Sequence, residues 1–199
     1  MIVIDVPPSG RLLWVVWAVS LIACSWPVIN WTHEVGHVLS AELTGGEVSR
    51  VVPDPRTFAR TEYAANPTPL AVVWSGPVTG TIAGVLLALA LLARRGRVLG
   101  CTVALLGATC LLANGAYIGL GAINPIADTE VMSRLGVPRW GMAVFGIPVA
   151  VAGRAVMVAS IGRLRGAPAP RREVAWVTVG TNTLLIGLAG VGLALFPDA

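Results

Sequence analysis

The stretch NWTHEVGHVL, residues 30–39, places two histidines and a glutamate inside an apolar segment. Apolar residues extend on both sides of it, from about Leu12 to Leu43, further than the roughly 20 residues that a helix needs to cross a bilayer. Ionisable residues are costly inside a membrane and are usually functional there. This stretch therefore predicts a membrane helix that carries a polar site.

The composition of the whole chain agrees with a membrane protein. Of the 199 residues, 55% are hydrophobic and only 12% are charged, and the mean hydropathy is +0.78. A soluble domain would need more polar residues to cover its surface. The net charge of +4 comes from arginines in loops, without interleaved aromatic residues, so no binding to nucleic acid is expected.

Five apolar stretches are long enough to span a bilayer. They run from about Leu12 to Leu43, Leu70 to Ala93, Val98 to Ala122, Trp140 to Ile161 and Val174 to Phe196. The first should be kinked or broken near Pro27, because proline removes a helix hydrogen bond. We predict an all-α polytopic protein of the plasma membrane, with five or six membrane-spanning helices in one domain over residues 1–199. Its core covers residues 12–139, and residues 140–199 form accessory helices.

Smaller features complete this prediction. Residues 47–52 have a β-like pattern after the HEVGH helix, and a loop with proline, asparagine and arginine follows them as far as Pro69. Each cysteine lies in an apolar run and is expected to be a buried thiol. Glycines four residues apart are expected to let helix backbones pack closely. The cysteines are Cys24, Cys101 and Cys110, and the glycines are Gly76, Gly80 and Gly84, with Gly115 and Gly119.

The two histidines of HEVGH can share one metal ion. His33 and His37 are the only histidines of the chain, and residues i and i+4 lie on the same face of a helix. A catalytic zinc takes three protein ligands, leaves one position for water and lowers the pKa of that water to about 7. Glu34 lies about 100° further round the helix, where it can accept the proton and pass it to a leaving amine. We predict one zinc ion with Glu34 as the catalytic base.

The third ligand must come from another part of the chain. Glu42 is five residues beyond His37 and points away from the shared face of the histidines, and the cysteines lack polar neighbours. Asp128 follows Asn124-Pro125, where proline is expected to break the third helix beside a wet cavity. Asp128 is therefore the predicted third ligand, and Glu130 is the alternative.

Several motifs occur in an order that resembles a known family. HEVGH is followed by residues 43–48, LTGGEV, which are similar to a small-residue turn into a β-strand. Residues 75–80, SGPVTG, resemble a Gly-Pro-x-x-Asn element, residues 124–128, NPIAD, resemble a Pro-x-x-Asp segment, and residues 128–140 continue the likeness. Over about the first 140 residues, the chain resembles the site-2 proteases, which are intramembrane zinc metalloproteases, and in particular their small, minimal bacterial branch.

This resemblance implies an endopeptidase that cleaves membrane-spanning substrates in or near their transmembrane segments, within the lipid bilayer. The chain departs from the family pattern at Thr129, Gly80, Leu120 and Ile123, where relatives carry glycine, asparagine, asparagine and proline, and Ala127 replaces the leucine of Leu-Asp-Gly. The family's asparagines are thought to hold the substrate. Asn114 and Asn124 are therefore predicted to bind substrate in their place, with an interhelical hydrogen bond as the equal alternative for Asn114.

The sequence is also compatible with other functions. Residues 47–52 are either a strand whose edge holds an extended substrate by β-augmentation or a plain loop. One alternative function is a proteolytically silent zinc-binding chaperone or partner subunit, although a silent protein would have no need of Glu34. Another is a zinc hydrolase that acts on an amphiphilic small molecule, which a wide pocket without a strand edge would favour.

Overall fold

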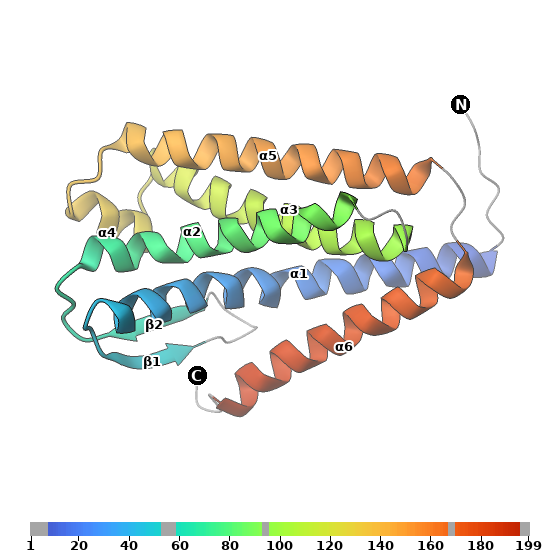
Figure 1. Ribbon diagram of the computed structural model, residues 1–199, viewed down its shortest axis with the longest axis horizontal. Coiled ribbons are helices and arrows are strands. Elements are labelled where there is room, and N and C mark those ends of the chain that lie inside the picture. The colour runs from blue at the N-terminus through green and yellow to red at the C-terminus, as the bar shows by residue number, and fades with distance from the viewer. Residues whose placement is uncertain (1–7, 53–58, 93–95, 167–169, 196–199) are drawn as a thin grey trace.

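The computed structural model describes residues 8–52, 59–92, 96–166 and 170–195, which form a bundle of long helices with a small sheet at one end (Figure 1). The elements are, in chain order, α1 (Pro8–Leu43), β1 (Val48–Val52), β2 (Arg60–Tyr63), α2 (Pro69–Ala88), the short 3-10 helix η1 (Leu89–Leu92), α3 (Arg97–Gly121), α4 (Asp128–Arg134), α5 (Arg139–Arg165) and α6 (Arg171–Leu195).

The five predicted membrane spans are confirmed. Among the described residues, five helices are long and apolar enough to cross a membrane: α1, α2 with η1, α3, α5 and α6. The predicted ends at Ala93 and Phe196 lie outside the described residues. α1 continues through Pro27 as one helix, so of the predicted kink or break, the break is wrong and the kink stays a prediction. Neighbouring helices and side chains can satisfy the backbone group that a membrane proline leaves free.

α3 is the central helix of the bundle. In its most apolar window 72% of the residues are buried, compared with 17–39% in the other spans. α5 packs closely along it because small residues face each other: a Cβ atom on Gly115 would lie 2.8 Å from the carbonyl oxygen of Gly146. This contact confirms the packing role predicted for Gly115.

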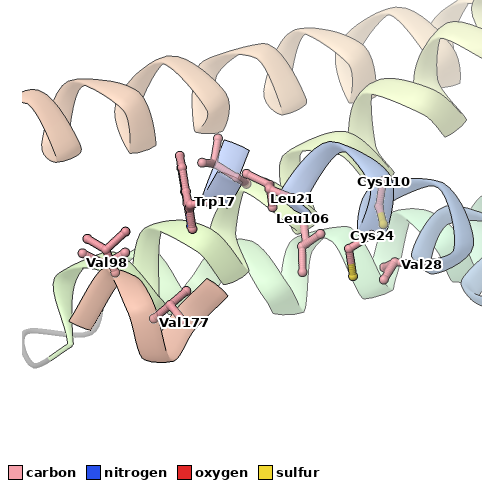
Figure 2. Packing of buried hydrophobic residues seen from close by; sticks show 10 residues of the cluster. Trp17, Leu21, Cys24, Val28, Val98, Leu106, Cys110 and Val177 are labelled. Atoms are coloured by element: carbon pink, nitrogen blue, oxygen red, sulfur yellow. The ribbon is translucent and has the colours of Figure 1, made fainter. Parts of the chain in front are cut away.

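Apolar side chains from α1, α3 and α6 form a core at the end of the bundle where α1 begins (Figure 2). α6 therefore packs against the rest of the protein through this core. The buried members of the core are Trp17, Leu21, Cys24, Val28, Val98, Leu105, Leu106, Cys110, Val174 and Val177. All three cysteines of the chain are buried and free, as predicted.

The polar elements lie at the opposite end, where α1 ends and α2 begins (Figure 1). β1 confirms the predicted strand, and it pairs antiparallel with β2, which lies in the predicted loop. The alternation of charged residues with Thr61 and Tyr63 suits a strand, but four residues are too few for a clear pattern. α4 was also not predicted, because its seven residues lie within a turn-rich connection.

Candidate metal centre

The structure brings His33, His37 and Asp128 together, although 95 residues separate His33 from Asp128. The histidines lie in the last third of α1, and Asp128 is the first residue of α4. The Oδ2 atom of Asp128 lies 3.0 Å from Nε2 of His33 and 3.4 Å from Nε2 of His37. One ligand atom from each residue lies within 4.8 Å of the others, as the ligands of one metal ion must.

The hydrogen bonds of the two imidazole rings fit a metal site. Nδ1 of His33 lies 2.8 Å from Oδ1 of Asn114, and Nδ1 of His37 lies 2.8 Å from the carbonyl oxygen of Val72. Carbonyl oxygens can only accept hydrogen bonds, so each Nδ1 carries a proton. In a neutral ring this leaves the lone pair on Nε2, which faces Asp128 and is available to a metal. Two imidazoles and a carboxylate are a donor set that suits zinc with one open position.

Asp128 is held at the metal centre by its backbone. Its N–H group donates a hydrogen bond to the hydroxyl oxygen of Tyr117 on α3, 2.9 Å away. Ala127 has a φ of 44°, a conformation that is rare for a residue with a side chain. α3 ends at Gly121 and α4 begins at Asp128, so the helix is interrupted in the segment that contains Pro125, as predicted. The helix ends where Gly121 lets the Thr129 side chain pack against its backbone.

The charge state of Asp128 also suits a ligand. Burial raises the pKa of its carboxyl group, but the two imidazoles, which in their protonated form donate hydrogen bonds to it and carry positive charge, outweigh this effect and leave the pKa below its ordinary value. The carboxylate is therefore ionised at neutral pH, the form in which it binds a metal.

Glu34 is buried beside the three candidate ligands and is not one of them. Its Oε2 atom accepts a hydrogen bond of 2.6 Å from the hydroxyl group of Thr61 on β2. Tyr63 lies on the same face of β2, and its pKa is raised by burial and by the negative charge of Asp128. β2 therefore lies over the metal centre. Neither residue is predicted from the sequence, because β2 is too short for a clear strand pattern.

Replacing Thr61 with valine should lower the rate of any reaction that uses Glu34 as a base. A hydrogen bond to a charged group contributes about 1.5–3 kcal/mol. Without the bond that orients the Glu34 carboxylate, the rate should fall about tenfold or more. Zinc content should not change, because Thr61 does not contact the ligands. Thr61→Ser keeps the hydroxyl group and should retain the activity; equal rates for the valine variant and wild type would contradict this role.

The remaining predicted residues lie at different distances from the centre. Asn114 is buried and contacts His33, whereas Asn124 is exposed in the turn before α4. Their substrate-binding role stays a prediction. Glu130, the alternative ligand, forms an ion pair with Arg134 and is outside the group of three ligands.

Two of the glycines on α2 lie against side chains of the candidate metal centre or against Asn114. A Cβ atom on Gly76 would collide with Nε2 of His37 and would lie 2.7 Å from Nε2 of His33. A Cβ atom on Gly80 would collide with the amide of Asn114. The prediction of plain helix packing is thus incomplete for Gly76 and Gly80, and it describes Gly84, which faces Leu111 and Gly107 on α3.

The substitution Gly76→Ala should weaken zinc binding. Its methyl group would displace both Nε2 atoms, so affinity should fall by at least the roughly 10–100-fold that disturbing an orienting group costs. Competition with a coloured chelator measures this affinity. Gly187→Ala on α6 is the matched control, since nothing lies within 4 Å of the added Cβ atom there. Wild-type affinity in the Gly76 variant would show that the ligands do not meet beside α2.

Comparison with known proteins identifies the family. A family model described as "Peptidase M50B-like" matches residues 11–165, which include both histidines, Glu34 and Asp128. No curated protein and no solved structure matches the chain. The matched region extends from α1 to the end of α5 and confirms the resemblance to site-2 proteases that the motifs indicated. The chain is a multi-pass membrane protein of the Peptidase M50B-like family.

Proposed function

We propose that this protein is an intramembrane zinc endopeptidase of the plasma membrane of a bacterial cell, and that it cleaves peptide bonds in or near transmembrane segments of its substrates. One observation carries the proposal: a buried carboxylate, Glu34, lies beside a three-residue ligand set whose imidazole rings are oriented for metal binding. Family membership supports the same activity.

The protein residues have distinct tasks in this reaction. His33, His37 and Asp128 would hold zinc, which when bound supplies a Lewis acid that polarises water and the scissile carbonyl group. Glu34 accepts a proton from the attacking water at its carboxylate and then donates that proton to the leaving amine. The hydrogen bond from Thr61 occupies Oε2 of Glu34 and leaves the other oxygen for this transfer.

The small sheet offers a way to present the substrate. A peptide must be extended at the cleaved bond, because helical hydrogen bonds enclose its carbonyl groups. The described sheet contains only β1 and β2, so each strand keeps one unpaired edge to which an extended peptide can add. Because Thr61 of β2 contacts Glu34, a peptide added to this sheet would lie next to the catalytic base.

The observations favour an endopeptidase over the two alternatives. A silent zinc-binding partner would not need a buried Glu34 held by a hydrogen bond from another element. A hydrolase of small amphiphiles would not need a strand edge beside the metal centre. A strand edge that lies over the metal centre instead suits a peptide.

The test uses the purified full-length protein in liposomes that contain a set of labelled transmembrane peptides. Mass spectrometry should detect new peptide termini that disappear with a zinc chelator and return when zinc is restored, with about one zinc bound per chain. Zinc binding without cleavage of any peptide would support the silent partner. Hydrolysis of liposome lipids with intact peptides would support the third function.

A further inference from the structure

Asn114 is an amide inside a membrane-spanning helix, and both of its polar atoms are used. It is 2% exposed, and its Nδ2 group donates a hydrogen bond of 2.9 Å to the carbonyl oxygen of Cys110. A carbonyl oxygen only accepts, so this bond determines which side of the amide carries the NH₂ group. The opposite atom, Oδ1, therefore faces Nδ1 of His33 as a pure acceptor.

This contact gives His33 a partner different in kind from that of His37. The main-chain carbonyl of Val72 accepts the Nδ1 proton of His37, and no side-chain substitution removes it. His33 depends on a side chain that comes from α3, 81 residues further along the chain. Among the described residues, Asn114 is thus the side chain that orients a histidine of the metal centre through its Nδ1 atom.

Gly80 provides the space for this contact. A Cβ atom at position 80 would overlap Nδ2 of Asn114 and would lie 2.9 Å from its Cγ and Oδ1 atoms. Only a residue without a side chain lets the Asn114 amide extend past α2 to His33. Gly80 and Asn114 lie on neighbouring helices, and both are needed for the hydrogen bond between Asn114 and His33.

We propose that Asn114 is a positioning residue that keeps His33 in the metal-binding tautomer and orientation, and that Gly80 makes room for it. This rests on the proposed zinc site and assigns Asn114 to the metal centre, and not to substrate. The geometry carries the assignment, because an acceptor on Nδ1 leaves Nε2 free for the metal and fixes the plane of the ring.

Zinc affinity, measured on the detergent-solubilised protein by competition with a coloured chelator, tests the proposal without any substrate. Asn114→Leu, which keeps the size of the side chain without its amide, should bind zinc about 10–100-fold more weakly than wild type. Asn182→Leu is the matched control: Asn182 lies on α6 and, like Asn114, takes part in two hydrogen bonds, which its Nδ2 group donates to the Ser20 hydroxyl group and the Thr178 carbonyl. Its loss should leave zinc affinity unchanged.

A double-mutant cycle tests the pairing with Gly80. Gly80→Ala alone should weaken zinc binding, because its methyl group pushes the Asn114 amide away from His33. In an Asn114→Ala background the same substitution should cost little more, since the amide is already gone. Additive losses in the double variant would show that Gly80 does not act through Asn114.

A spectroscopic signature separates positioning from general destabilisation. The chain has two histidines, so the zinc-loaded protein should show two downfield Nδ1 proton resonances. Asn114→Leu should shift only that of His33, while the His37 signal, held by Val72, stays in place.

If wild type binds zinc and Asn114→Leu matches it in affinity and in both signals, the inference is wrong and the zinc site stands. If wild type itself binds no zinc, the proposed function fails first. An Asn114 variant with normal zinc affinity but weaker substrate binding would instead assign Asn114 to the substrate.

Discussion

Replacing Glu34 with glutamine should abolish peptide cleavage and leave zinc bound. Glutamine keeps the size of the side chain and can still accept the hydrogen bond from Thr61, but its amide does not take up a proton at neutral pH. Loss of a general base costs about 10²–10⁴ in rate. Zinc content should stay at the wild-type level, because Glu34 is not one of the three ligands.

The matched control for this variant is Glu42→Gln on the same helix. Glu42 is exposed and accepts a long hydrogen bond of 3.4 Å from the N–H group of Val48, outside the metal centre. Its replacement should leave cleavage unchanged. Cleavage by Glu34→Gln at the wild-type rate would exclude Glu34 as the base. Because the inactive variant keeps its substrate intact, it can also trap natural substrates by crosslinking in the membrane.

Replacing Asp128 with alanine should abolish stable zinc binding. The carboxylate is the one ligand that α1 does not supply, and its Oδ2 atom lies within 3.4 Å of both Nε2 atoms. The loss in affinity should exceed the roughly 100-fold that removal of an orienting residue costs, because a direct ligand is gone. In wild type, zinc at 100 times its dissociation constant should add about 2.7 kcal/mol to the free energy of unfolding. The alanine variant should show no such gain.

Glu130→Ala provides the control for Asp128. Glu130 lies in the same short helix, is half exposed and pairs with Arg134, so its removal should leave zinc binding unchanged. Full zinc binding by the Asp128 variant, together with loss of zinc binding in the Glu130 variant, would show that Glu130 and not Asp128 is the third ligand. Thermal unfolding with and without zinc, followed for both variants, distinguishes these outcomes.

The Thr61 and Asn114 contacts show why part of the site could not be predicted. Thr61 reaches Glu34 across 27 residues, from a strand of four residues that has too little pattern to be recognised. For Asn114 the sequence left substrate binding and an interhelical hydrogen bond open, and only the structure shows that such a bond is made to His33 on α1. The sequence signal for Asn114 is Gly80, which stands where the family pattern has an asparagine and leaves space for the side chain of Asn114.

The sequence alone determined the membrane helices and the two histidines with their glutamate, because hydropathy and helical periodicity depend on residues that are close together in the chain. It also led to Asp128, by elimination among few polar residues. The tertiary structure decided which polar groups meet the ligands: the Val72 carbonyl, Asn114, Tyr117 and Thr61 come from different elements. Their contacts depend on how closely α1, α2 and α3 pack and on where β2 lies, and such distances arise only when the chain is folded.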